Sequence, residues 1–191
     1  MESEAMAGEE GSARRVPYRK PLLPLTRGRA EYDGEHRLWL RREWVGSGAD
    51  EEGHALWIGL APGYANGTAD DELTRRQQTF TSNRLGLAAM VCCNLCTITP
   101  KNPSDLWRTE SPIHDSNTKT ILHWAGDATT IILGFGTPPE PLSSAAYRLL
   151  GMLKREMYRP ICFGKTPEGW PRNYLKVGQT SQFEEFRLDA Y

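Results

Sequence analysis

The sequence lacks the features that mark membrane and secreted proteins. No apolar run approaches the roughly 20 residues that a transmembrane helix needs. The N-terminal segment MESEAMAGEE has neither the basic region nor the apolar region of a secretory signal, so we expect a cytoplasmic protein. Hydrophobic residues make up 39% and charged residues 25% of the 191 residues, which is typical of a folded chain of about one domain.

Cysteine is scarce, with four residues in the chain. Cys93 and Cys96 have the CxxC spacing of some zinc and redox sites, but no second CxxC follows to complete a zinc site. They belong to the apolar stretch AAMVCCNLC, which we expect to be a buried strand, and residues three apart on a strand point to opposite faces. We therefore expect buried thiols, no metal and no cofactor, in a reducing compartment.

An excess of charge of one sign is also absent, since 23 Lys and Arg face 24 Asp and Glu, for a net charge of −1. Taken alone, this balance argues against a nucleic-acid partner. The charges are unevenly placed, however: acidic residues crowd into residues 2–10, whereas residues 14–42 hold nine Lys and Arg. We expect residues 1–30 to form a flexible arm, basic from Arg14, that is either a solubilising tail or a phosphate-contacting segment. Residues 31–191 would form one domain.

Short apolar runs alternate with helical patterns along this domain. Strands are expected at 36–44, 55–60, 88–97, 129–133 and 160–163, the first of them in a hairpin after the turn Asp33-Gly34, and helices at 70–87, 116–125 and 142–158. This alternation predicts an α/β fold, with three α/β/α layers around a central four-stranded, mainly parallel sheet. Ligands bind at the carboxyl ends of such strands, so the loops 61–71, 94–103, 134–139 and 165–174 should meet at one site.

Several polar and small residues in these loops suit ligand binding. Asn94 lies in an apolar run, where its amide either matches the donor and acceptor edge of a nucleobase or holds a neighbouring loop. Asp70 and Asp71 lie where a helix begins, which fits either helix capping or catalysis. Gly59 and Gly63 leave room for close backbone approach to an anion, although the same residues suit an ordinary turn.

Four motifs, in this order, resemble the uracil-DNA glycosylase superfamily: GLAPG at 59–63, VCCNL at 91–95, IILGFG at 131–136 and GWPRN at 169–173. In that superfamily a Gly-x-x-Pro turn follows the first strand, an Asn ends the second, a small-residue turn follows the third, and a last loop enters the minor groove. The spacing of the motifs, together with TPEGWPRNYLK, also resembles an uncharacterised bacterial and phage family. The resemblance covers residues 32–177.

This resemblance implies a monofunctional DNA glycosylase, which hydrolyses the N-glycosidic bond of a base flipped out of double-stranded DNA and leaves an abasic site. Such an enzyme would act as a monomer without a cofactor. The superfamily places Asp or Asn before the proline of the first turn, whereas this chain has Ala61. We therefore assign the positioning of the attacking water to Asp70 or Asp71, helped by Asn66. The base would be bound by Asn94, Gly63, Tyr64, Phe80 and Phe135.

The last loop of the superfamily carries a His that stabilises the leaving base, and here Trp170 stands nearest to that position. By the same resemblance, Trp170 and Arg172 would form a wedge that enters the duplex. The full set of expected DNA contacts is Arg75, Arg76, Lys165, Trp170, Arg172 and Asn173.

Gly63 suggests the kind of base. Uracil-specific members of the superfamily have a bulky Tyr there that resembles a wall against substituents on C5, and Gly removes that wall. We therefore expect a bulky 5-substituted cytosine, such as the glucosylated 5-hydroxymethylcytosine of phage DNA, and a role in antiviral defence. Three other interpretations remain: a nucleotide-processing enzyme of a base-modification pathway, a non-catalytic DNA-binding module on the same fold, and a small-ligand α/β protein.

Overall fold

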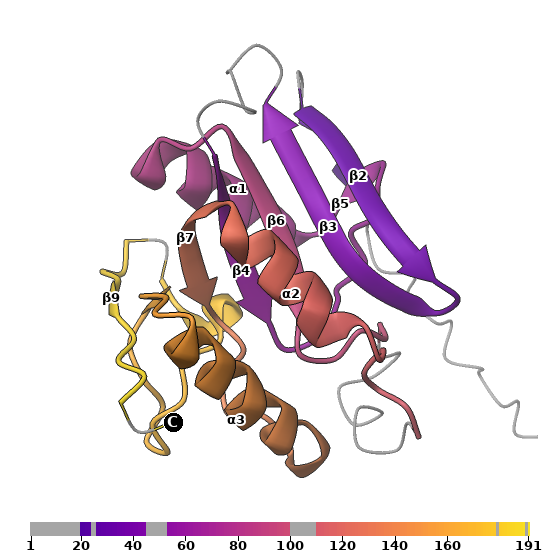
Figure 1. The fold of residues 1–191 in the computed structure, drawn as a ribbon. Helices are drawn as coiled ribbons and strands as arrows, with labels where there is room; N and C mark the ends of the chain where they lie inside the picture. The colour runs from indigo at the N-terminus through magenta and orange to yellow at the C-terminus, as the bar shows by residue number, and fades with distance from the viewer. Residues whose placement is uncertain (1–19, 24–25, 45–52, 100–109, 179, 190) are drawn as a thin grey trace, which may run out of the picture.

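One mixed sheet of seven strands runs through the protein, with helices packed against it (Figure 1). The computed structural model describes residues 20–23, 26–44, 53–99, 110–178, 180–189 and 191. In chain order the elements are β1 (Lys20–Pro21), β2 (Thr26–Asp33), β3 (His36–Trp44), β4 (His54–Gly59), β5 (Ala69–Asp70), α1 (Glu72–Leu85), β6 (Ala89–Asn94), α2 (Asn117–Gly126), β7 (Ala128–Leu133), α3 (Glu140–Arg155), β8 (Ile161–Cys162), the 3-10 turn η2 (Tyr174–Lys176) and β9 (Glu184–Glu185).

The sheet has the order β2-β3-β6-β4-β7-β8-β9. Parallel pairing joins β6 to β4, β4 to β7 and β7 to β8, whereas the other neighbours pair antiparallel. The α/β class predicted from the sequence is confirmed. The sheet is larger and more mixed than the expected four strands, because the hairpin β2-β3 continues it beyond β6 and β9 continues it beyond β8.

The N-terminal boundary also differs from the expectation. Residues 26–30, assigned above to the arm, belong to β2 and pair with residues 40–44 of β3. Lys20 and Pro21 pair with β5 in a separate two-stranded sheet. The ordered domain therefore starts within the expected arm, while residues 1–19 lie outside the described residues.

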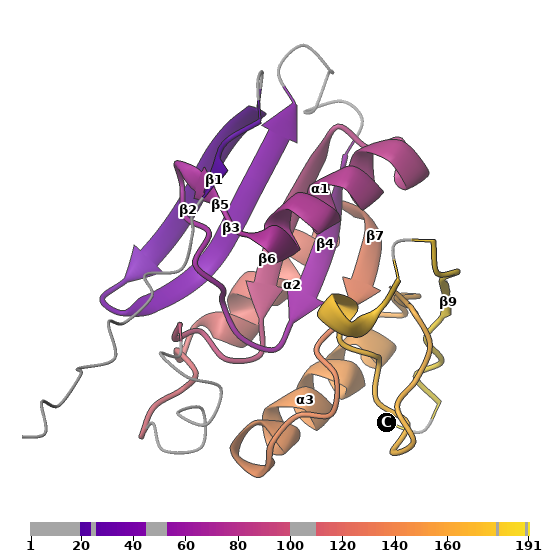
Figure 2. The ribbon, with the colours of Figure 1, turned by 180° about the vertical axis from the view of Figure 1, so that it is seen from behind.

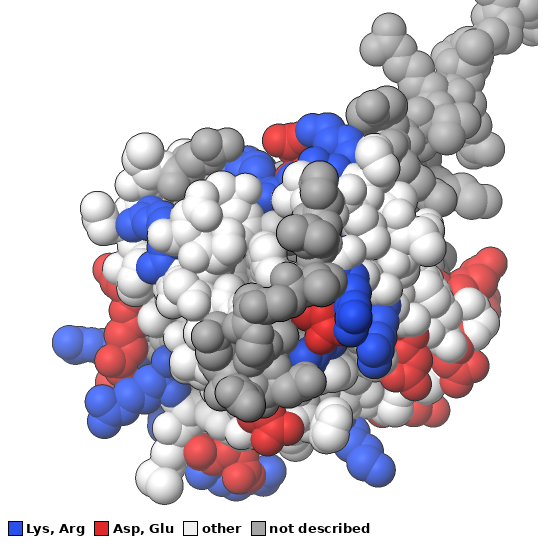
Figure 3. Space-filling model, turned by 90° about the horizontal axis from the view of Figure 1, so that it is seen from above, with Lys and Arg blue, Asp and Glu red and all other residues white. Residues whose placement is uncertain are grey.

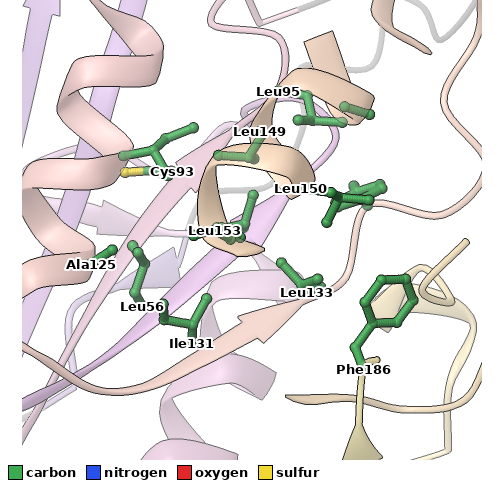
Figure 4. Packing of buried hydrophobic residues seen from close by; sticks show 14 of the residues in the cluster. Leu56, Cys93, Leu95, Ala125, Ile131, Leu133, Leu149, Leu150, Leu153 and Phe186 are labelled. Atoms are coloured by element: carbon green, nitrogen blue, oxygen red, sulfur yellow. The ribbon is translucent and has the colours of Figure 1, made fainter. Parts of the chain in front are cut away.

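The central parallel strands are apolar because helices cover both of their faces, with α1 on one side and α2 and α3 on the other (Figures 1 and 2). Every residue of β6 is buried, as are five of the six residues of β4. Figure 4 shows Leu149, Leu150 and Leu153 of α3 packed toward Leu56 and Ile131 of the sheet. The opposite face packs Leu40, Ala55, Trp57, Met90, Cys92 and Ile132 against Phe80 of α1 and against Phe163, Tyr174 and Val177.

The expectation of buried thiols is confirmed, because all four cysteines are free and buried. Cys92 faces the α1 side of the sheet and Cys93 the other side. Burial raises the pKa of the Cys92 thiol to about 12, so this thiol stays protonated at neutral pH. Within the described part of the chain, no group of three or more His, Cys, Asp or Glu is placed to hold a metal ion. No helix in that part is long and apolar enough to cross a membrane.

His54 at the start of β4 makes stability depend on pH. Its Nε2 lies 3.0 Å from the Trp124 carbonyl oxygen. Burial lowers the pKa of His54, and Arg41 adds to this, whereas the Trp124 carbonyl and Asp127 act in the opposite direction. Because the folded state then binds a proton less readily than the unfolded state, the contribution to stability is present above about pH 6.5 and is lost as pH falls.

We expect the urea midpoint of unfolding to fall between pH 7.5 and pH 5.5 because the unfolded chain takes up a proton at His54. In His54→Gln this pH dependence should be smaller, since glutamine can still donate to the Trp124 carbonyl but does not titrate. An equal fall in midpoint for the two proteins would show that other groups cause it. His123→Gln, on the same side of the molecule, is the matched control.

Candidate functional site

A cavity of about 70 Å³ lies at the carboxyl ends of β4, β6 and β7. Each of the four loops expected to meet there supplies part of its lining, with Asp71 from the first, Asn94 from the second, Gly134 from the third and Asn173 from the fourth. This expected convergence is confirmed for the described residues, whereas residues 100–103 of the second loop lie outside them. In Figure 2 the yellow turn of η2 lies near the end of β4, below α1.

Asp71 is held at the edge of this cavity by two backbone donors. Its Oδ1 accepts from the Thr74 N–H at 2.8 Å and caps α1, and its Oδ2 accepts from the Ala65 N–H at 3.2 Å. A Cβ atom on Gly63 would lie 2.1 Å from Oδ2. The glycine is therefore needed because the carboxylate occupies the space of its missing side chain, which differs from the expected opening for a C5 substituent.

Asn94 is the last residue of β6, as expected, and its side chain is only 6% exposed. A Cβ atom on Gly59, its partner in β4, would lie 2.6 Å from Asn94 Oδ1, so the amide is packed directly over this glycine. The Asn94 backbone is held by Asn117 Nδ2, which donates to the Asn94 carbonyl at 2.9 Å. Asn94 Nδ2 is buried and has no partner among the described residues. A buried donor of this kind favours a ligand with an acceptor.

Arg37 also lines the cavity, and sequence reasoning did not single it out. It is the second residue of β3 and is only 4% exposed. Its Nη1 donates to the Ala65 carbonyl at 2.7 Å, whereas its Nε is buried without a partner among the described residues. Burial lowers the pKa of this guanidinium, and the nearby Asp71 carboxylate opposes that shift. The site therefore contains a carboxylate and a buried cation together.

The aromatic residues at the cavity are Trp57 and Tyr174, which were not among the expected base contacts. Their ring centroids are 4.7 Å apart. Asn173 precedes η2 and accepts from the Leu175 N–H through Oδ1 at 2.9 Å, which fixes the turn that carries Tyr174. A signal for Tyr174 was present in the sequence, because it ends the loop expected to reach the site.

Asp70 is placed differently from its neighbour. Its side chain is fully buried and does not line the cavity. Oδ1 pairs with Arg42 Nε at 2.9 Å, while Oδ2 pairs with Arg75 Nε at 3.0 Å and accepts from Gln78 Nε2 at 2.9 Å. With both oxygens taken up by the protein, Asp70 joins β3, β5 and α1. This arrangement corrects the expectation that Asp70 can position a water.

Asn66 and Tyr64 belong to the first loop but do not line the cavity. Asn66 Oδ1 accepts from the N–H groups of Thr68 and Ala69, each at 2.9 Å, which makes a local turn. Tyr64 is half-buried. The structure therefore assigns Asn66 to the loop's own geometry rather than to a catalytic water.

Three expected DNA or base contacts are core residues. Phe135 and Trp170 are 1% and 6% exposed and belong to the core on the α3 side. The Trp170 ring lies 4.8 Å from that of Tyr147, so it is packed within the protein instead of projecting as a wedge. Phe80 lies on the α1 side, 4.9 Å from the Phe163 ring, and does not reach the cavity.

A larger depression of about 460 Å³ runs along α1 beside the cavity and shares Tyr174 with it. Its charged lining consists of Lys20, Arg75, Arg76 and Arg84 together with Glu72. The Arg76 guanidinium lies 5.1 Å from the centre of the Tyr174 ring and donates to the Leu175 carbonyl at 3.1 Å. We call this surface the basic groove.

Lys165 and Arg172 are exposed on the loop before η2. The Lys165 Nζ lies 5.2 Å from the centre of the Phe186 ring, and Arg172 Nε donates to the Lys165 carbonyl at 3.1 Å.

Figure 3 views the other end of the sheet, at the amino ends of the parallel strands. There Lys and Arg side chains lie next to Asp and Glu side chains in several places on the visible face.

Comparisons with known proteins add one finding to this geometry. No curated protein and no solved structure matches the chain. Residues 37–173 match a family model described as "Protein of unknown function (DUF1643)". The matched segment runs from Arg37 to Asn173, and it contains Asp71 and Asn94 as well as these two cavity residues. Since it spans well over half of the chain, the protein belongs to the DUF1643 family.

Proposed function

We propose that the protein is a DNA glycosylase, which hydrolyses the N-glycosidic bond of a modified pyrimidine flipped out of double-stranded DNA. The observation that carries this proposal is the combination of the Asp71 carboxylate and the unpartnered Asn94 amide in one cavity at the carboxyl ends of parallel strands. The first suits a reaction that builds positive charge on a sugar. The second suits recognition of a base edge.

The reaction passes through a state that resembles an oxocarbenium ion, with positive charge on the deoxyribose and negative charge on the departing base. The Asp71 oxygens each accept one backbone N–H, which leaves lone pairs for a water. In this role Asp71 orients the water toward C1′ of the sugar and takes its proton, while its charge stabilises the cation. Asn94 Nδ2 donates to a carbonyl oxygen or ring nitrogen of the base.

The cavity suits a group that enters from one side. Its volume of about 70 Å³ is below the 300–1,000 Å³ of sites that enclose a whole small-molecule ligand. A flipped base is the end of such a ligand, because the sugar and phosphates stay outside. Trp57 and Tyr174 offer aromatic surface to the inserted ring, and contacts of this kind offset the few kcal/mol that flipping costs.

The basic groove supplies a path for the DNA strand next to the cavity. Lys20, Arg75, Arg76 and Arg84 line it, and phosphate contacts from such side chains give affinity without sequence preference. Lys165 and Arg172, which are exposed on the loop before η2, add further positive charge. This arrangement supports DNA as the polymer that carries the base.

The proposed substrate is a 5-substituted cytosine such as glucosylated 5-hydroxymethylcytosine, and the proposed role is defence against phage in the cytoplasm. The resemblance of the four motifs to the glycosylase superfamily supports this part of the proposal. The space at Gly63 does not, because the Asp71 carboxylate fills it.

The test is an abasic-site assay. The purified protein is incubated with phage DNA that contains glucosylated 5-hydroxymethylcytosine and with duplexes that contain 5-hydroxymethylcytosine, uracil or hypoxanthine, and the products are cleaved with alkali. We expect alkali-sensitive sites in at least one modified DNA and none in unmodified DNA. Salt-dependent binding with no cleavage would instead indicate a non-catalytic DNA-binding module. Turnover of mononucleotides without cleavage of DNA would indicate a nucleotide-processing enzyme.

A further inference from the structure

Arg37 is a cation buried at the candidate site without a carboxylate partner. Among the described residues, the one hydrogen bond of its guanidinium is the donation from Nη1 to the Ala65 carbonyl at 2.7 Å. Arg42, on the same strand, is buried to a similar degree, but it pairs with Asp70 at 2.9 Å. A buried charge without a partner lowers stability unless something else contacts it. The unused donors of Arg37 therefore favour a ligand that accepts hydrogen bonds.

A bulge in the hairpin aims Arg37 at the cavity. Glu31 pairs with Trp39, but the next residue, Tyr32, pairs with Arg37, so Leu38 is the extra residue on β3. Strict alternation would put Arg37 on the face of Trp39, which packs against the α2 side of the sheet. The extra residue reverses this, and the Arg37 side chain instead reaches Ala65 on the α1 side. A bulge that redirects one charged side chain into a cavity is typical of a functional site.

Both signs of charge that the reaction needs are then present. Asp71 and Arg37 line the same cavity, and their electrostatic interaction favours the charged form of Arg37. During cleavage the bond between C1′ and the base nitrogen breaks and its electron pair goes to the base. The water oxygen bonds to C1′, and the base takes up a proton from solvent after it leaves. An anionic base and a cationic sugar thus exist together, and each needs a counter-charge.

Resting on the proposed function, we propose that Arg37 is a catalytic residue that donates hydrogen bonds to the departing base and stabilises the negative charge on it. The superfamily that the sequence resembles gives this role to a His of the last loop. Trp170 stands nearest to that position here, and it is packed in the core. In this protein the positive charge that stabilises the departing base would come from Arg37 of β3 instead.

The test compares leaving groups. Single-turnover rates are measured on duplexes that carry the base cleaved by the wild type and an analogue made more acidic by an electron-withdrawing substituent. Arg37→Met should slow cleavage of the poorer leaving group by about 10²- to 10³-fold, the effect typical of losing one charge-stabilising donor. The more acidic analogue should be slowed much less. The cleavage rate of Arg37→Lys on the poorer leaving group should lie between those of Arg37→Met and the wild type. Arg155 is an exposed residue of α3, so Arg155→Met should cleave at the wild-type rate.

The outcomes separate this inference from the proposed function. If the wild type produces no abasic sites, both are overturned. If the wild type cleaves and Arg37→Met slows both bases equally or not at all, the assignment of Arg37 is overturned while the glycosylase remains. If Arg37→Met shows no cooperative unfolding transition, the Arg37→Lys variant is used instead. Slower cleavage by this variant of the poorer leaving group alone supports the role of Arg37. A Lys variant with the wild-type ratio of rates contradicts it.

Discussion

Asp70→Asn is expected to lower the free energy of unfolding by about 3–5 kcal/mol, the usual cost of removing one partner of a buried ion pair. Asp70 and Arg42 are both fully buried, with Nε and Oδ1 2.9 Å apart. The neutral amide leaves the Arg42 charge without its counter-charge. It also turns one acceptor oxygen into an N–H₂ group that faces the donors of Arg42, or those of Arg75 and Gln78. Urea unfolding followed by circular dichroism measures the change.

Glu72→Gln is the matched control, because Glu72 lies two residues away and pairs with Lys20 at 2.7 Å on the surface. Its side chain is 65% exposed, so its loss should leave the unfolding curve unchanged. The double variant Arg42→Met/Asp70→Leu should be more stable than the sum of the single effects predicts, since it removes both buried charges. An Asp70→Asn protein that unfolds at the wild-type urea concentration would show that the Arg42–Asp70 pair does not stabilise the fold.

Asp71→Asn is expected to slow base excision by about 10²- to 10⁴-fold, the range that a positioned general base contributes. The same substitution should lower the free energy of unfolding by no more than about 1 kcal/mol, because Asn caps a helix as well as Asp does and only the 3.2 Å bond from the Ala65 N–H is lost. The retained Oδ1 can still accept from the Thr74 N–H. Single-turnover excision and urea unfolding of the same sample therefore separate chemistry from folding at this position.

Asp71→Ala extends the comparison. It removes the cap as well as the charge, so we expect the same loss of rate together with about 1 kcal/mol more destabilisation than Asp71→Asn causes. If Asp71→Asn keeps the wild-type rate, the carboxylate is only a cap of α1, and the proposed role in orienting water is excluded. The two neighbouring aspartates thus have opposite expected effects, since Asp70→Asn acts on stability and Asp71→Asn on rate.

The parts of the fold that depend on local pattern could be predicted from the sequence. Unbroken apolar runs placed β4, β6 and β7 within a few residues of their observed bounds, because a strand covered on both faces must be apolar throughout. The meeting of the loops followed from the parallel arrangement, which brings carboxyl ends to one edge. Asn94 could be identified as a site residue because a polar residue at the end of an apolar strand needs a hydrogen-bond partner.

What could not be predicted depends on long-range placement. The bulge that redirects Arg37 arises from pairing between β2 and β3, and a pattern of alternating residues cannot show which residue is extra. Asp70 and Asp71 are equivalent in the sequence, but only the first faces Arg42, which lies 28 positions away. Trp170 lies in a loop motif that resembles a DNA-inserting segment, and the aromatic residues that bury it come from distant parts of the chain.

The two margins of the sheet have a consequence for self-association. The outer strand β2 presents alternating exposed side chains that are charged, namely Arg27, Arg29, Glu31 and Asp33. The other margin, β9, is only two residues long, and both are glutamates. Short or charged edge strands discourage another chain from adding to a sheet, and so protect a protein against edge-to-edge aggregation. The charged outer strand of the hairpin that delivers Arg37 to the cavity therefore also disfavours the pairing of a second copy along this edge.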